Sequence, residues 1–425
     1  MTITSTEILF EQPVKIKQDV EIVEFNNKAE EKQYLAICGD RHYVINSFVY
    51  NLLLIITKFG SIEDIRKEFS CVQNTEYYKD EIISLINDIL VKKELVETLI
   101  PIENKRPKSF LYFKMPIFSK RDLDPITFLF QNLFRPAIAY LIIGLILTVH
   151  VLFFISFSDQ APLVKIVDDP LSFILSMIIM LFSVIFHEFG HSSACRFHGA
   201  KYEEIGFGIY LRFPVFYSNI TDAWRLPSNK RVIIDVAGIY FQYIFNLVLI
   251  TLFLITKQDV LIITIKIICI QTLFSLNPFF RYDGYWIATD LLGIPNLRKK
   301  SSEMLTYLTQ KYLLNRKVKN PITQKVKPLI RNIFTIYAAI SNMFFIYIVF
   351  AFSTGILFIL KGFPMIIQDS INVFQNSDIY TLKQFLTIAF QLTTRLLIIA
   401  LSFIFFYTII RRILETIKNL FLLAK

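Results

Sequence analysis

The sequence predicts a mainly α-helical, polytopic membrane protein with a small α+β domain at its N-terminus. Three observations support this fold class. Hydrophobic residues make up 54% of the 425-residue chain, and apolar runs long enough to cross a membrane recur beyond about residue 134. The first hundred residues instead mix polar and apolar positions, as a soluble domain does. Basic residues gather in alternate loops between the apolar runs, which is typical of multi-pass proteins.

Residues 1–103 are predicted to form the N-terminal domain, with a winged-helix-like arrangement. The strand-like runs YLAIC and RHYVIN flank Gly39-Asp40, a hairpin signal. Stretches with helical spacing follow over SFVYNLLLIITKFG, SIEDIRKEF and EIISLINDILVKKELVETL. The polar opening of the chain does not resemble a signal peptide, so this domain is expected in the cytoplasm. A basic linker over residues 104–133 is predicted to join it to the membrane part.

Six membrane-spanning helices are predicted, each long enough for a hydrocarbon core of ~30 Å. They are approximately Phe134–Phe157, Leu171–Ser193, Val232–Thr256, Val260–Arg281, Ile333–Leu360 and Phe385–Ile410. This gives a membrane core over 134–295, a basic cytoplasmic loop over 296–332 and two C-terminal spans within 333–425. The connections after the second and fourth spans are rich in Lys and Arg, so both termini are expected in the cytoplasm of a bacterial cell membrane.

Charge and cysteine content exclude other classes of protein. The net charge of +10 falls mostly in the loops, so it is attributed to topology and anionic lipid, and no nucleic acid is expected as a partner. The four cysteines are scattered, which indicates neither a disulfide framework nor a cysteine zinc site. Lys266 and Arg395 lie inside predicted spans, where a charge is costly, and are expected to face the bundle interior or a wet cavity.

The stretch EEIGFGIYLRFPVFYSNI is apolar and aromatic but is interrupted by Gly206, Gly208 and Pro214. It is too broken for a span and is interpreted as strands or a re-entrant β hairpin, which membrane depth allows only inside protein or beside a wet cavity. An ordinary interfacial loop is the alternative. If strands form, Gly206 and Gly208 become candidate substrate-binding residues, because an extended peptide can pair with the edge of a sheet.

The segment LFSVIFHEFGHSSACRF places an HExxH motif at the end of the second predicted span. On a helix, His187 and His191 share a face and can bind one zinc ion, and Glu188 is placed to act as the general base. A catalytic zinc needs a third protein ligand, for which Asp283 in LNPFFRYDGYW is the strongest candidate. The predicted topology brings Asp283 to the same membrane depth as the histidines. Asn277 offers an amide either for the substrate backbone or for hydrogen bonds that support the metal ligands.

These motifs carry a resemblance to a known family. HEFGH on an apolar helix with a downstream NP…DG segment resembles the site-2 protease family of intramembrane zinc metalloproteases. TDAWRLPSNKR and NPFFRYDGYW are similar to a bacterial branch of peptide zinc metalloproteases found with ribosomally made, modified peptides. The resemblance implies a site-2-protease-like core in which His187, His191 and Asp283 bind zinc and Glu188 is the general base. The family's GPxxN-like segment is reduced here to GIYFQ, which leaves the roles of Asn277 and Gln242 open.

The N-terminal domain carries a second resemblance. YLAICGDRHYVINSFVYNLLLIITKFGSIEDIRKEF followed by INDILVKKELVE is similar to PqqD-like domains, which implies recognition of a peptide substrate by strand addition. Together the resemblances imply an intramembrane zinc endopeptidase that matures a small ribosomal peptide, with a peptide exporter or a modifying enzyme as further partners. Two alternatives stay open: proteolysis of a membrane-anchored regulator, and a non-catalytic partner in peptide export or immunity.

Overall fold

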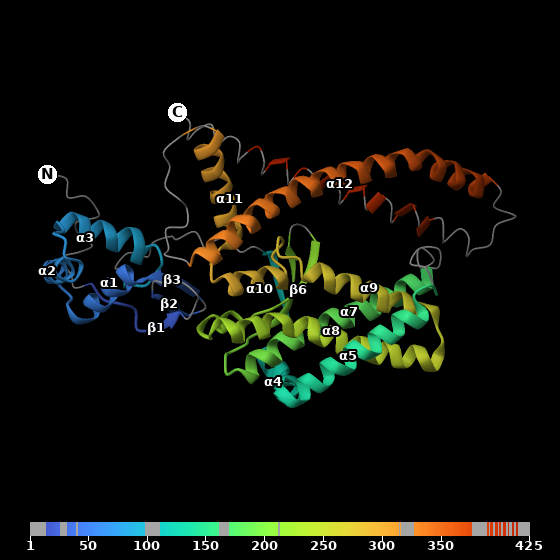
Figure 1. Cartoon of the computed structure of the whole chain (residues 1–425), viewed down its shortest axis with the longest axis horizontal. Coiled ribbons are helices and arrows are strands. Elements are labelled where there is room, and N and C mark those ends of the chain that lie inside the picture. Colours follow the sequence, from blue (N-terminus) through green and yellow to red (C-terminus); the bar gives the residue numbers. More distant parts are fainter. Residues whose placement is uncertain are drawn as a thin grey trace.

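A computed structural model describes residues 14–25, 32–39, 41–97, 111–160, 170–210, 213–313, 315 and 327–375, with scattered positions between 389 and 414. Figure 1 shows the two parts of the chain: a small N-terminal domain and a bundle of long helices beside it. A long helix, α12 (Pro328–Gln375), extends across one side of that bundle. The described part is therefore mainly helical, as the sequence predicts.

The N-terminal domain is a three-stranded antiparallel sheet covered by helices. The strands β1 (Val20–Phe25), β2 (Gln33–Cys38) and β3 (Arg41–Asn46) lie in the order β1-β2-β3. The predicted hairpin between β2 and β3 is confirmed by the pairing of Cys38 with Arg41. The helices α1 (Ser47–Lys58), α2 (Ile62–Gln73) and α3 (Lys79–Leu85), with the π-helical turn η2 (Ile86–Val91), pack apolar side chains against this sheet. β1 was not expected from the sequence, and it faces the membrane core.

The segment interpreted as a linker is in large part structured. Its described portion forms the strand β4 (Leu111–Phe118), the helix α4 (Lys120–Phe130) and the short 3-10 helix η3 (Gln131–Phe134). β4 pairs with β5 (Ile205–Tyr210), which pairs in turn with β6 (Phe213–Ser218), so the order is β4-β5-β6. The two strands predicted in the glycine-broken stretch are thus present, and a third strand from the expected linker joins them. Residues 111–134 belong to the core rather than to a connection.

Four helices in the described residues are long and apolar enough to cross a membrane. They are α5 (Pro136–Phe157), α7 (Pro170–Phe197), α8 (Ser228–Thr256) and the first part of α12, Pro328–Ile348. The fourth predicted span corresponds to α9 (Asp259–Ser275), whose 17 residues are fewer than the 28 of α7. α9 stops well before Arg281, since the chain turns before α10 (Asp283–Leu292). Most of the sixth predicted span, Phe385–Ile410, lies outside the described residues.

Close packing of α7 against α8 positions the candidate site. A Cβ added to Gly190 of α7 would lie 2.4 Å from the carbonyl oxygen of Ala237 on α8, so only glycine allows this approach. α10 also packs against α8, as its contacts with that helix show. The expected basic loop over 296–332 contains the helix α11 (Leu297–Leu308), which continues into the π-helical turn η5 (Thr309–Leu313) and packs on α12.

Lys266 binds the end of a neighbouring helix. Its ammonium group donates to the backbone carbonyls of Ser158 and Gln160, each at 2.7 Å, just beyond the C-terminus of α5. These carbonyls lack intrahelical donors, and a cation at a helix C-terminus is favourable. The positive charge of Lys266 therefore has a structural role, because it binds the carbonyl groups at the end of α5. Arg395 lies outside the described residues.

Candidate metal centre

Helix α7 places the two motif histidines side by side. His187 and His191 are one helical turn apart, and their Nε2 atoms lie 3.0 Å from each other. Both side chains are buried, with 7% and 5% of the residue exposed. The four-residue spacing puts them on one face of the helix, as the HExxH motif predicts.

The turn after α9 places Asp283 beside the two histidines. Its carboxylate oxygens lie 3.1 Å from His187 Nε2 and 3.5 Å from His191 Nε2. One ligand atom from each of the three residues falls within 4.8 Å of the others. Asp283 opens α10, so its position follows from the turn before it and from the packing of that helix. The structure therefore brings together the three residues that the sequence singles out, although about ninety residues separate them.

Two acceptors behind the histidines determine which ring nitrogens face the centre. His191 Nδ1 lies 2.7 Å from the backbone carbonyl of Ile234, which can only accept, so this nitrogen carries the proton. His187 Nδ1 lies 3.1 Å from Oε1 of Gln242, with the same consequence. Both Nε2 atoms then present lone pairs, as metal-ligating histidines with an acceptor behind them do. Sequence reasoning left Gln242 open and missed Ile234, because a backbone carbonyl carries no residue-type signal.

Two imidazole Nε2 atoms and a carboxylate converge here, an arrangement of donor atoms that suits a cation. Nitrogen and oxygen ligands about 2.0 to 2.1 Å from zinc in a tetrahedron lie about 3.3 Å apart. The three separations in the structure, from 3.0 to 3.5 Å, are close to that spacing. The donor set therefore fits zinc and leaves the fourth tetrahedral position for a water or a substrate oxygen.

A glycine on α8 keeps the space beside the imidazoles open. A Cβ added to Gly238 would lie 2.4 Å from His187 Nε2 and 2.5 Å from His191 Nε2. Any larger side chain would occupy the volume toward which both lone pairs point. Gly238 is the residue that GIYFQ retains from the family's GPxxN-like segment. In this structure it leaves space for the two imidazole rings.

Glu188 follows His187 on α7 and is buried, with 7% of the residue exposed. Glu188 lies three residues before His191 on α7, so the two side chains are neighbours along the helix. A carboxylate in this position can accept a proton from a water at the centre.

The remaining predicted site residues lie elsewhere in the structure. Asn277 Oδ1 accepts a hydrogen bond from the backbone N–H of Phe279 at 2.8 Å, so its side chain shapes the turn that leads to Asp283. Gly206 and Gly208 lie in β5, the central strand, whose backbone pairs with β4 on one side and β6 on the other. The expectation that a substrate pairs directly with these two glycines is therefore wrong, because β5 is not an edge strand. The free edges of this sheet, within the described residues, belong to β4 and β6.

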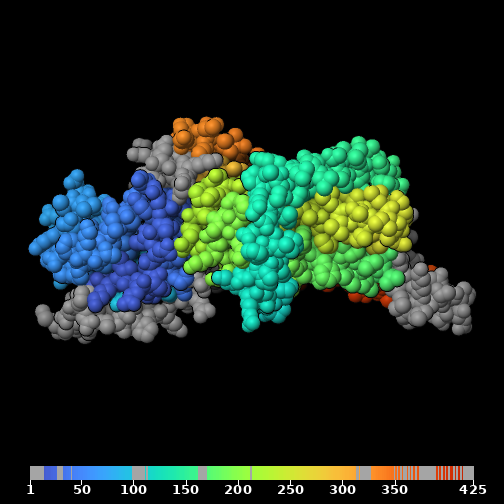
Figure 2. All heavy atoms as spheres, turned by 90° about the horizontal axis from the view of Figure 1, so that it is seen from below, coloured from blue at the N-terminus to red at the C-terminus, as the bar shows by residue number. Residues whose placement is uncertain are grey.

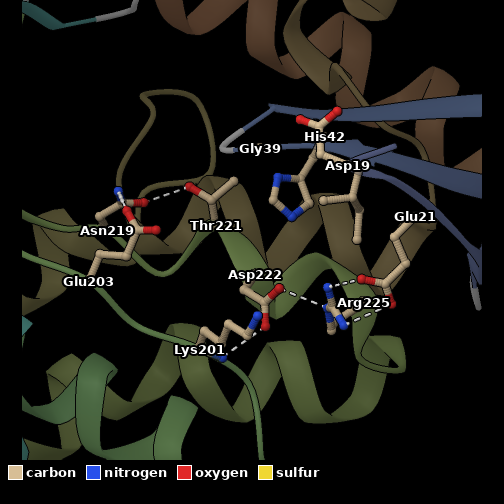
Figure 3. A pocket seen from close by; sticks show the side chains of 11 residues that line it. Asp19, Glu21, Gly39, His42, Lys201, Glu203, Asn219, Thr221, Asp222 and Arg225 are labelled. Carbon is tan, nitrogen blue, oxygen red and sulfur yellow. Dashed lines mark hydrogen bonds and ion pairs between the residues drawn. The ribbon is translucent and has the colours of Figure 1, made fainter. Parts of the chain in front are cut away.

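A separate cavity of about 320 Å³ lies between the N-terminal domain and the core, as Figure 3 shows. Its lining includes Glu21 from β1 and Lys201, Glu203 and Asp222 from the core. Arg225, in the short 3-10 helix η4 (Thr221–Arg225), bridges the two parts: its two Nη atoms lie 3.2 and 3.0 Å from the Glu21 carboxylate. The three convergent donor residues do not line this cavity. Figure 2 shows the blue N-terminal domain directly against the yellow-green part of the core.

Comparisons with known proteins agree with the chemistry of the centre. The profile of peptidase family M50 matches residues 175–401, more than half of the chain. The chain is 25% identical to the "Putative peptide zinc metalloprotease protein YydH" of Bacillus subtilis (strain 168) over 207 residues, which cover 47% of this chain and 80% of that protein. No solved structure matches. Because the profile match includes both histidines and Asp283 and spans more than half of the sequence, the chain belongs to peptidase family M50, the site-2 proteases.

Proposed function

We propose that this protein is a multi-pass zinc endopeptidase of the bacterial cell membrane that cleaves a small, ribosomally made peptide during its maturation. The observation that carries the proposal is the convergence of His187, His191 and Asp283 on one point in a member of a metallopeptidase family. The apolar helices α5, α7 and α8 support a membrane location. The basic connections support an orientation with both termini in the cytoplasm.

The residues of the centre divide the chemistry between them. His187, His191 and Asp283 hold zinc, with Gln242 and the Ile234 carbonyl fixing the two imidazole rings. When bound, zinc supplies a Lewis acid that polarises the scissile carbonyl and lowers the pKa of the attacking water. Glu188 accepts the proton of that water and returns it to the leaving amine. His187, His191 and Glu188 are buried and the Asp283 side chain is only 17% exposed, which limits access of bulk water and strengthens these electrostatic interactions.

Recognition of the peptide is assigned to the N-terminal domain. In the described residues β3 has one unpaired edge, next to α1, and an extended peptide could add there as a further strand. The contact between β1 and the core then holds the bound peptide near the membrane. The resemblance to PqqD-like domains supports this partner, and YydH carries a name that also refers to peptide processing.

At the centre itself, the free edge of β6 is the candidate contact for an extended substrate, since β6 packs beside α7. Successive backbone amides of a strand point to opposite sides. Of the N–H groups of Val215 and Phe216, one therefore faces β5 and the other faces the free edge. One of the variants Val215→Pro and Phe216→Pro is therefore expected to slow cleavage of an identified substrate at least about tenfold. Zinc content should stay unchanged in that variant. Normal cleavage by both proline variants would rule out pairing along β6.

Removal of Asp283 provides the direct test of the metal site. Detergent-purified wild-type protein is expected to contain about one zinc per chain, and Asp283→Ala is expected to lose it during purification, because two ligands bind more weakly than three. Elemental analysis measures zinc per chain. The matched control is Asp259→Ala, which removes an exposed carboxylate at the start of α9 and should keep the zinc.

Activity is then measured on small precursor peptides with wild-type protein and the Asp283→Ala variant. Zinc-dependent cleavage by the wild type alone supports the proposed endopeptidase. A folded wild-type protein without zinc, which also leaves every peptide intact, would contradict it and favour a non-catalytic partner in peptide export or immunity. Cleavage of membrane-anchored proteins but not of small peptides would point instead to processing of a regulator.

A further inference from the structure

One face of α8 carries three groups that lie behind the two histidines. Gln242 and the Ile234 carbonyl bind the two imidazoles, and Gly238 leaves room for them. Arg231 continues the same face at the N-terminal end of the helix, since the spacings of three or four residues keep these positions aligned. Arg231 is buried, with 4% of the residue exposed, so its charge needs partners within the protein.

The partner of Arg231 is Asp290 on α10, the helix that begins with Asp283. Arg231 donates to Asp290 Oδ1 from Nε at 2.8 Å and from a second guanidinium nitrogen at 2.7 Å. A third nitrogen of the group donates to the Leu226 carbonyl at 2.7 Å. Asp290 lies seven residues, or about two helical turns, after Asp283, so both carboxylates are on one face of α10. The bond to Arg231 thus fixes the helix that presents the third ligand.

The N-terminal domain closes over this ion pair. The ring of Phe25, the last residue of β1, lies 4.9 Å from the Arg231 guanidinium and stacks on Trp224 with ring centroids 5.8 Å apart. Trp224 in turn contacts Trp286 of α10 edge-on, at 6.2 Å. Phe25 is 4% exposed. A residue of the N-terminal domain therefore shields from water the contact that anchors α10 to α8.

On the basis of the zinc function proposed above, we propose that Arg231 is a positioning residue for Asp283 and that docking of the N-terminal domain through Phe25 completes this support. Arg231 touches neither the histidines nor the substrate position. It acts by holding α10 against α8, so that the Asp283 carboxylate stays within reach of both Nε2 atoms. A rigid aspartate binds zinc more tightly than one on a loosened helix, because less order is lost on binding.

Zinc affinity, measured by competition with a chelator on the full-length protein in detergent, tests the proposal. Arg231→Met is expected to weaken zinc binding about 10- to 100-fold, the range found when a group behind a metal ligand is removed. Arg231→Lys keeps the charge but cannot form both hydrogen bonds of the guanidinium, so a smaller loss of zinc affinity is expected. This variant replaces Arg231→Met in the test if the methionine variant does not fold. Arg66→Met is the matched control: it removes an arginine that pairs with Glu63 on the same helix, α2, and it should change zinc affinity less than about twofold.

Repeating the Arg231→Met measurement in the Asp283→Ala variant separates a positioning role from a general loosening of the fold. In Asp283→Ala, added zinc is held by the two histidines alone, so Arg231→Met should leave this residual affinity nearly unchanged. An equal loss in both backgrounds would overturn the positioning role, as would unchanged affinity in Arg231→Met itself. Failure of the wild-type protein to bind zinc would instead refute the proposed function, which the first measurement of the series decides.

Phe25→Ala tests the contribution of the N-terminal domain. Opening the guanidinium to water should weaken zinc binding about threefold, less than loss of Arg231, since water then competes for the pair. If zinc affinity is unchanged in Phe25→Ala but reduced in Arg231→Met, Arg231 positions Asp283 without help from the N-terminal domain.

Discussion

Peptide cleavage is expected to fall about 10³-fold when Glu188 is replaced by glutamine, while zinc stays bound. Glutamine has nearly the same size and shape but cannot accept the proton, and a positioned general base contributes about 10² to 10⁴ in rate. His187, His191 and Asp283 are unchanged in this variant, so the metal content should equal that of the wild-type protein. Initial rates on an identified peptide, together with zinc per chain, measure both effects.

Glu68→Gln is the matched control for this variant, because it makes the same substitution at an exposed position of α2. Its activity should be that of the wild-type protein. Cleavage by Glu188→Gln at more than about a tenth of the wild-type rate would show that another group takes the proton. Loss of zinc from Glu188→Gln would show that the carboxylate also helps to hold the metal.

Gly238→Ala is expected to have the second large effect, through loss of zinc. The added Cβ would lie 2.4 to 2.5 Å from the Nε2 atoms of His187 and His191, so at least one ring must move. Neither ring can move without weakening its bond to Gln242 or to the Ile234 carbonyl. Zinc affinity should fall at least about 100-fold, as it does when the geometry behind a ligand is lost. Chelator competition and the cleavage rate measure the effect.

The chain offers a close control for Gly238→Ala. Gly144 lies in α5, and a Cβ there would meet no heavy atom within 4 Å. Alanine favours a helix over glycine by about 1 kcal/mol, so Gly144→Ala should keep its zinc and its stability. Both variants gain the same helix propensity, and only Gly238→Ala alters the space at the centre. Wild-type zinc affinity in Gly238→Ala would mean that the imidazoles do not occupy the positions described here.

The convergence of His187, His191 and Asp283 could be predicted because its signals are local or follow from helix direction. His187 and His191 share a face in any α-helix, whatever surrounds it. Asp283 could be added because the predicted spans bring it to the same membrane depth. The structure brings the three residues together, and the profile match supports the family that the motifs suggest.

The rest depends on contacts between distant segments, for which a single sequence holds little signal. Met115 pairs with Phe207 across more than ninety residues, so β4 was hidden in what looked like a linker. The Ile234 carbonyl could not be found from residue types at all. By sequence Arg231 is one of several basic residues after the second predicted span, although an arginine this close to an apolar run, with Asp290 further on, is a usable sign of a buried ion pair.

The 17 residues of α9 have a consequence for the surrounding lipid. At 1.5 Å per residue the helix is about 26 Å long, shorter than a hydrocarbon core of ~30 Å. Its C-terminal half exposes Ile270, Leu273 and Phe274, directly before the turn that leads to Asp283. If α9 crosses the membrane, its length produces a hydrophobic mismatch that local thinning of the bilayer relieves. Headgroups and their water would then lie closer to the level of His187, His191 and Asp283, and the proposed peptide substrate would cross less of the apolar layer to reach them.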